Sequence, residues 1–213
     1  MELLKAIAEN VRNGNAGKVT ELVKKALDEK IHWSVVLEKG LSAGMEVVGH
    51  LFKDEEIFLP EVLMAAKAMD AGQKVLEPLM LGAGGGRKLG TVVLGTVKGD
   101  MHNLGKNLVN IMLRGAGFEV VDLGVDVASD IFVERAISEK AQVVGMSALL
   151  TTTMPHMRTV IEGLHRAGLK DRVKTIVGGA CVTQQFADKI GADAYADNAG
   201  GAVTKIKELL GLI

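Results

Sequence analysis

Five short β-rich runs alternate with helical stretches in the second half of the chain, and this alternation constrains the fold more than any other feature. In chain order the runs are TVVLGTV, FEVVDLG, AQVVGMS, VKTIVGG and ADAYAD. Most of them end in or near glycine, and each precedes a helical stretch of roughly a dozen residues. Regular alternation of this kind indicates a parallel, doubly wound α/β sheet. We predict a flavodoxin/Rossmann-like five-stranded parallel sheet with a flavodoxin-like strand order.

Residues 1–81 follow a different pattern, because apolar side chains recur there at helical spacing almost throughout. We expect one helix over MELLKAIAENV, a second over AGKVTELVKKALDEK and a third over about 31–52. A fourth helix has Pro60 in its first turn and runs to about Leu81. Four helices with short connections predict a small antiparallel four-helix bundle.

A glycine-rich segment, GAGGGRKLG at residues 82–90, lies between these two halves. Its composition indicates a flexible hinge. We therefore predict two domains, a helical bundle over 1–84 and an α/β domain over 85–213. Ligands of doubly wound sheets bind outside the carboxyl ends of the strands, so we expect the functional loops of the second domain at that edge.

Composition excludes several classes of function. The formal net charge is -1, which gives no reason to expect nucleic acid or an anionic membrane surface as a partner. Cys181 is the single cysteine, which excludes an intramolecular disulfide framework and any multi-cysteine metal site. The first residues, MELLKAIAEN, lack the pattern of a signal peptide. We expect a cytoplasmic protein.

The loop after the first β-run reads Gly-Asp-Met-His-Asn-Leu-Gly, residues 99–105. In one interpretation Asp100 or Asn103 caps the next helix and His102 lies in solvent. In the other, His102 is a metal ligand whose second ring nitrogen donates to Asp100. The remaining histidines form no cluster with it in the sequence, so the metal would have to arrive already held by a cofactor. That requirement points to a macrocycle.

Two further loops follow later β-runs. MSALLTTTMP places Ser147 at a strand end, with Thr151 and Thr153 beyond it. These hydroxyls suit either a helix cap or hydrogen bonds to a polar ligand tail. VGGACVT contains Gly178 and Gly179, whose missing side chains would let a bulky group approach the backbone.

Together, Asp-x-His-x-x-Gly, Ser-x-Leu and Gly-Gly in this order resemble the cobalamin-binding domain of B12-dependent methyltransferases and mutases. The stretch GTVKGDMHNLGKNLVNIMLRGAGFEVVDLGVDV also resembles methionine synthase. GMEVVGHLFKDEEIFLPEVLMAAKAMDAGQKVLEPL resembles the four-helix cap of that enzyme. A two-domain chain of this size is most similar to the corrinoid proteins of methanogens and acetogens.

The resemblance implies a cobalamin or related corrinoid, alternating between methylcob(III)alamin and cob(I)alamin. His102 Nε2 would replace the displaced lower base on cobalt, and Asp100 would hydrogen-bond the other ring nitrogen. The serine that completes this relay in the family corresponds to Thr153, which keeps the hydroxyl. Further implied cofactor contacts, including room for the nucleotide tail at the double glycine, are Gly99, Met101, Asn103, Gly105, Ser147, Leu149, Thr151, Gly178, Gly179 and Ala199.

The helical half contributes its own implied contacts. Phe52 and Phe58 flank the turn between the third and fourth helices, and Leu59 and Val62 continue that surface. By themselves such residues fit a bundle core. By resemblance they form an apolar lid over the methyl face of the corrin, which would exclude water and must open for chemistry. Glu38 matches another contact in the family, although a solvated surface position explains it as well.

The function implied is that of a methyl carrier, a component of a B12-dependent methyltransferase system that completes no reaction alone. A substrate-specific methyltransferase would load it from a methylamine, methanol, a methyl ether or a betaine. A second methyltransferase would pass the methyl group to tetrahydrofolate or coenzyme M, and a reductive activation protein would restore the cobalt. The alternatives are the cobalamin-binding subunit of a mutase, which typically lacks the cap, and a cobalamin-sensing regulatory module.

Overall fold

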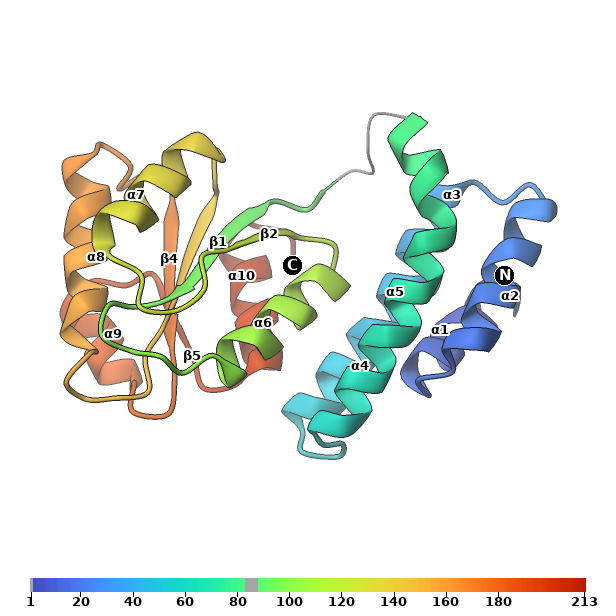
Figure 1. The fold of residues 1–213 in the computed structure, drawn as a ribbon, viewed down its shortest axis with the longest axis horizontal. Helices are drawn as coiled ribbons and strands as arrows, with labels where there is room; N and C mark the ends of the chain where they lie inside the picture. Colours follow the sequence, from blue (N-terminus) through green and yellow to red (C-terminus); the bar gives the residue numbers. More distant parts are fainter. Residues whose placement is uncertain (1, 83–87) are drawn as a thin grey trace. The chain divides into compact units, whose positions relative to one another are not determined.

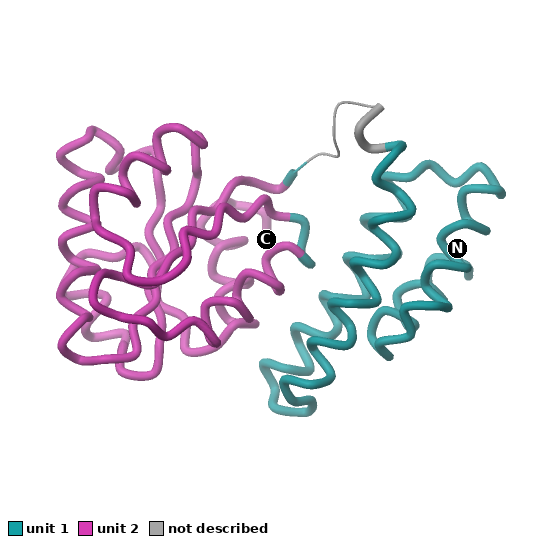
Figure 2. The backbone as a smooth tube through the Cα atoms, viewed as in Figure 1, with its two compact units in different colours: residues 1–88, 115–117 teal, residues 89–114, 118–213 magenta. Residues whose placement is uncertain are grey.

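The computed structural model describes residues 2–82 and 88–213, which form two compact units. One unit comprises residues 1–88 with 115–117, and the other 89–114 with 118–213 (Figure 2). The predicted domain boundary, between 84 and 85, and most of the predicted hinge fall outside the described residues.

The first unit is helical, as the apolar spacing predicts. Helices α1, α2 and α5 pack together with a run of α3, η1 and α4 that contains a π-helical turn (Figure 1). Pro60 lies at the start of the last helix, where its missing N–H costs nothing. The elements are α1 (Glu2–Arg12), α2 (Ala16–Asp28), α3 (Trp33–Val36), η1 (Leu37–Ser42), α4 (Ala43–Lys53) and α5 (Leu59–Gly82).

The π-helical turn η1 is the one departure from the predicted helix over 31–52. Val36 and Leu41 are five residues apart, a spacing that an α-helix would place on different faces. The wider turn brings both into the core, since both are fully buried. Met45 and Val48 then continue the same buried face at ordinary helical spacing. The bulge therefore keeps one apolar face continuous along the whole run.

The second unit is a five-stranded sheet in the order β2-β1-β3-β4-β5, with every pairing parallel. This confirms the predicted fold class and strand order. Helices α7, α8 and α9 cover one face, and α6 and α10 the other (Figure 1). None of the helices in the described ranges is long and apolar enough to cross a bilayer. The strands are β1 (Thr91–Thr96), β2 (Glu119–Asp122), β3 (Val143–Ser147), β4 (Lys174–Gly178) and β5 (Ala194–Ala196); the helices are α6 (Leu104–Gly115), α7 (Ser129–Ser138), α8 (Pro155–Arg166), α9 (Gln184–Ile190) and α10 (Ala199–Leu209).

The strand register brings the loop-forming ends to one edge of this sheet. Thr96 pairs with Ser147, Ser147 with Gly178, and Gly178 with Ala196. The chain leaves β1 toward β2 on one side and continues through β3 on the other, so the gap between β1 and β3 is the topological switch point. The loops that follow these two strands therefore meet where such sheets bind ligands.

Candidate functional site

The loop after β1 begins with a tight turn over residues 97–100. The Asp100 N–H donates to the Val97 carbonyl oxygen at 3.1 Å, and Gly99 at the third position has a φ of 80°. A type II turn requires this left-handed value at its third position, which favours glycine. Beyond the turn Asp100 is fully buried, whereas the side chain of His102 is 51% exposed.

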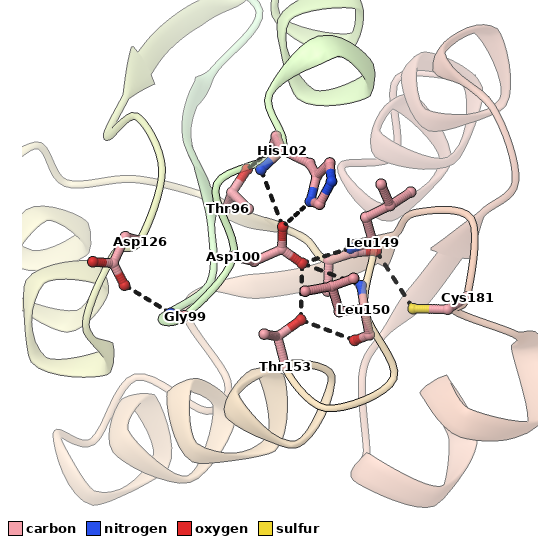
Figure 3. A network of polar contacts seen from close by, with 10 residues as sticks. Thr96, Gly99, Asp100, His102, Asp126, Leu149, Leu150, Thr153 and Cys181 are labelled. Carbon is pink, nitrogen blue, oxygen red and sulfur yellow. Dashed lines mark hydrogen bonds and ion pairs between the residues drawn. The ribbon is translucent and has the colours of Figure 1, made fainter.

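The Asp100 carboxylate is the centre of the site (Figure 3). Its Oδ1 accepts from His102 Nδ1 at 2.7 Å and from the His102 N–H at 3.1 Å. Its Oδ2 accepts from the N–H groups of Leu149 and Leu150, at 2.7 and 3.2 Å, and from the Thr153 hydroxyl at 2.8 Å. Two loops about 50 residues apart in sequence are thus joined through one buried side chain.

These contacts keep the carboxylate ionised. Burial alone would raise the pKa of Asp100, but the hydrogen bonds from Leu149, His102 and Thr153 outweigh it and hold the pKa well below its usual range. An ionised carboxylate only accepts hydrogen bonds, so the proton of the neutral imidazole lies on Nδ1. Nε2 then presents a lone pair, and it has no hydrogen-bond partner among the described residues. This is the arrangement of a metal-ligating histidine with its supporting carboxylate.

Thr153 lies between two acceptors. Its Oγ1 is 2.8 Å from Asp100 Oδ2 and 2.9 Å from the Leu150 carbonyl oxygen. The residue is buried, and one hydroxyl has one proton to donate. Thr153 therefore belongs to the Asp100 cluster and is not the cap of α8, whose first turn has no side-chain cap.

The same geometry decides between the two interpretations of the first loop. Helix α6 begins at Leu104, whereas the Asp100 carboxylate is bonded to His102 and to residues of the loop after β3. Asp100 therefore does not cap α6. The turn-only interpretation therefore fails for Asp100, whereas a cap by Asn103, directly before α6, stays a prediction.

Apolar side chains are exposed around the imidazole. Met101 and Leu104, on either side of His102 in the chain, are 68% and 67% exposed, and Leu149 and Leu150 are also exposed. An added Cβ on Gly105 would meet no heavy atom within 4 Å. Large exposed apolar side chains around a ligand-competent nitrogen fit a broad, partly apolar ligand.

The fold itself requires the double glycine at the end of β4. A Cβ on Gly178 would lie 2.8 Å from the Ala196 carbonyl oxygen. A Cβ on Gly179, whose φ is 127°, would lie 1.9 Å from the Ala148 carbonyl oxygen. Neighbouring backbone therefore already occupies the space into which side chains at these two positions would extend. Contact between these two glycines and a cofactor tail stays a prediction.

The other predicted contacts of this unit occupy the same edge of the sheet. Asn103 and Thr151 are exposed, Ser147 is partly buried at the end of β3, and Ala199 is buried as the first residue of α10. Their roles stay predictions.

The five residues predicted in the helical unit differ in exposure. Phe58, just before α5, is 69% exposed, and Glu38 in η1 is also exposed. Phe52 and Leu59 are partly buried. Val62 is fully buried, which removes its side chain from the exposed part of the predicted lid.

Three polar residues that the sequence did not single out lie near the His102 loop: two bond to it, and a third joins the start of α6 to the end of β2. The Thr96 hydroxyl donates to the His102 carbonyl oxygen at 2.8 Å, and Asp126 accepts the Gly99 N–H at 2.7 Å. Lys106, almost fully buried, donates to both carboxylate oxygens of Asp122 at 2.6 Å. Of the three, only Lys106 could have been noticed in the sequence, because it directly follows Gly105 of the motif.

Cys181, also near the cluster, has its Sγ 3.7 Å from the Ala148 carbonyl oxygen (Figure 3). Burial raises the pKa of its thiol, and the charge of Asp100 acts in the same direction. The thiol is therefore poorly suited to act as a thiolate ligand.

The described residues contain no group of three His, Cys, Asp or Glu side chains that could hold a metal ion. His102 supplies a single ligand. The arrangement therefore suits a metal whose other ligands come from a cofactor, in agreement with the reasoning from the sequence.

Comparisons with known proteins agree with this chemistry. Residues 90–204 match a B12 binding domain, and residues 3–77 match a second B12 binding domain model. The chain is 52% identical to dimethylamine corrinoid protein 3 of Methanosarcina acetivorans, over 98% of this chain and 97% of that protein. It is 47% identical to the trimethylamine corrinoid protein of Methanosarcina barkeri, over 98% and 97%. It also superposes on the methanol:cobalamin methyltransferase complex of Methanosarcina barkeri with a TM-score of 0.88 and 31% identity, covering 99% of this chain and 80% of that one.

Proposed function

We propose, because this chain belongs to the family of corrinoid proteins with B12 binding domains, that it carries methyl groups in a methylamine-utilising system. Its general activity follows from the family: it is a corrinoid protein of a methyltransferase system. The observation that carries the proposal is the exposed imidazole of His102, anchored through Nδ1 to a buried, ionised carboxylate.

The residues present fit a corrinoid. The Nε2 lone pair of His102 would hold the metal, and the exposed Met101, Leu104, Leu149 and Leu150 would suit the apolar parts of a macrocycle. Gly105 leaves open space next to the same loop. When bound, the corrinoid supplies a cobalt centre that accepts and gives up a methyl group.

The chain's own contribution is to set how strongly His102 binds. A hydrogen bond from Nδ1 to the Asp100 carboxylate raises the basicity of the imidazole and fixes its orientation. Nε2 could hold either the metal or a proton, and Asp100, 2.7 Å from Nδ1, would stabilise the imidazolium that a proton gives.

The methyl donor we propose is a methylamine. The support is that the relatives of 47–52% identity described above are named for dimethylamine and trimethylamine. A methylamine-specific methyltransferase would load the protein, a second methyltransferase acting on coenzyme M or tetrahydrofolate would unload it, and an activation protein would restore reduced cobalt. In the helical unit, the exposed ring of Phe58 stays a candidate for the predicted apolar lid.

The first test is the ultraviolet–visible spectrum of the purified chain after loading with hydroxocobalamin and desalting. We expect the wild type to retain the cofactor with a base-off, histidine-ligated spectrum, and His102→Ala to lose that ligation. His165→Ala, at the far end of α8, is the matched control and should behave as wild type. A wild-type chain that retains no corrinoid would refute the proposal.

The second test concerns the donor. The loaded and reduced protein is methylated by methyltransferases specific for monomethylamine, dimethylamine, trimethylamine or methanol. Faster methylation by a methylamine enzyme supports the proposed class. Methylation by the methanol enzyme alone would refute it.

A further inference from the structure

The loop after β2 runs alongside the loop that carries His102. The Val127 N–H donates to the Thr96 carbonyl oxygen at 3.0 Å, which continues the pairing of β1 with β2 beyond the strands. One residue earlier, the Asp126 N–H donates to the Asp100 carbonyl oxygen at 2.9 Å. The Asp126 carboxylate in turn accepts the Gly99 N–H at 2.7 Å (Figure 3). Asp126 thus holds two peptide groups of the turn, one with its backbone and one with its side chain.

The side-chain contact determines the orientation of the central peptide of that turn. In the turn over residues 97–100, the central peptide joins Lys98 to Gly99, and its N–H is the group that Asp126 accepts. Type I and type II turns differ by reversal of this peptide. A carboxylate placed on the N–H side stabilises the type II orientation, the one in which the φ of Gly99 is 80°. The turn ends at Asp100, so holding its central peptide restrains the residue whose carboxylate bonds His102.

The backbone of Asp126 is itself unusual, since its φ is 54°. Residues other than Asn, Asp and Gly rarely adopt this left-handed backbone conformation. Here it directs the N–H and the carboxylate of one residue to the same turn. Among the described residues, Gly99 is the only hydrogen-bond partner of the Asp126 side chain. Neither burial nor a helix cap accounts for this carboxylate.

We propose that Asp126 is a positioning residue for the axial ligand: it holds the turn that aims Asp100 and His102, and thereby favours ligation of a corrinoid cobalt by the imidazole. The inference rests on the proposed function for its consequence at cobalt. Its structural part, control of the turn, concerns the protein alone. Both parts can be measured separately.

Three variants test the consequence at cobalt. Asp126→Gly keeps the left-handed backbone and its N–H but removes the acceptor, whereas Asp126→Asn keeps an acceptor oxygen. Lys140→Gly is the control, since Lys140 also has a positive φ, 50°, and lies at the end of α7, where its N–H bonds to the Ile137 carbonyl oxygen. Each protein is loaded with hydroxocobalamin and reduced to the cobalt(II) state. The splitting of the electron paramagnetic resonance signal by an axial nitrogen then reports the histidine-on fraction.

We expect Asp126→Gly to lower the ratio of histidine-on to histidine-off cobalt by about tenfold, as the loss of a hydrogen bond to a charged group predicts. Asp126→Asn and Lys140→Gly should remain close to wild type. A wild-type ratio in Asp126→Gly, or a ratio in Asp126→Asn as low as in Asp126→Gly, would overturn the proposal.

The structural part is measured on the apo-protein by amide hydrogen exchange. The Gly99 amide should be protected in the wild type and exchange at least about tenfold faster in Asp126→Gly. If Asp126→Gly does not fold, the wild type decides: a Gly99 amide that exchanges like an unstructured chain overturns the proposal, and protection supports it. Failure of the wild type to retain hydroxocobalamin refutes the proposed function, while the Gly99 exchange still decides the role of Asp126 in the turn.

Discussion

Asp100→Asn should separate the support of His102 from the fold around it. A carboxamide has one acceptor oxygen and one NH2 donor, so an NH2 group must take the place of either Oδ1 or Oδ2. On the Oδ2 side it would face the N–H groups of Leu149 and Leu150, which cannot reverse. On the Oδ1 side it would face His102 Nδ1, which can give up its proton, and the His102 N–H, whose longer bond of 3.1 Å would be lost. We therefore expect the NH2 group to face His102 and the imidazole to carry its proton on Nε2, where it blocks metal ligation.

The magnitude follows from the hydrogen bonds that this substitution weakens or reverses. Hydrogen bonds to a charged group contribute about 1.5–3 kcal/mol each, and about 1.4 kcal/mol corresponds to a factor of ten. The 2.7 Å bond from Nδ1 is the one whose direction must reverse, so the ratio of histidine-on to histidine-off cobalt should fall about 10- to 100-fold. The free energy of unfolding should fall by about 2 kcal/mol, because the buried site loses its charge-assisted bonds.

The assay compares spectra of hydroxocobalamin-loaded variants with urea unfolding of the same apo-proteins. Asp193→Asn is the matched control, because Asp193 Oδ2 also accepts a backbone N–H and a hydroxyl, both from Thr175 at 2.8 Å. Asp193 precedes β5, at the opposite edge of the sheet from His102. The control should lose stability but keep the histidine-on spectrum. A wild-type spectrum in Asp100→Asn would refute the tautomer argument.

The remaining predictions concern the same cluster and the loops beside it. Thr153→Val removes one donor to Asp100 and should lower the free energy of unfolding by about 1–3 kcal/mol in urea; no change would contradict the role of that hydroxyl. Gly179→Ala should lower it by about 3 kcal/mol or more, because the new Cβ would meet the Ala148 carbonyl oxygen. Gly105→Ala should leave apo stability equal or up to about 1 kcal/mol higher but weaken hydroxocobalamin binding, and unaltered binding would argue against ligand contact there. Finally, the depressed pKa of Asp100 means that its carboxylate stabilises the fold above its unfolded pKa of about 3.9 and loses this effect as pH falls further; the Tm of wild-type apo-protein should therefore drop more steeply below about pH 4 than that of Asp100→Asn.

The fold could be predicted because its signals are local. Strand–helix alternation and helical spacing depend on neighbouring residues, and they indicated both the parallel sheet and the helical unit. The Asp100–His102 pair was also foreseeable, since the two side chains are two residues apart and their types suit a supported ligand. What sequence spacing cannot supply is contact across the sheet.

Three features that depend on packing between distant residues were missed. The bond from Asp126 to Gly99 joins loops 27 residues apart and follows from the register of β1 with β2. The need of the fold itself for the double glycine was missed, because only the assembled sheet brings the Ala148 and Ala196 backbone close to these positions. The π-helical turn in the third helical run depends on packing of the helical unit, and helical periodicity alone does not indicate it.

The hydroxyl of Thr153 has a consequence for how the site accommodates a change of charge. Two acceptors, Asp100 Oδ2 and the Leu150 carbonyl oxygen, compete for its single proton. When a proton on His102 Nε2 offsets the negative charge of Asp100, Oδ2 becomes a weaker acceptor and the hydroxyl can rotate toward Leu150. No heavy atom would need to move. The loop can therefore stay rigid while its protonation state alternates, because the adjustment is the rotation of one hydrogen atom about one bond.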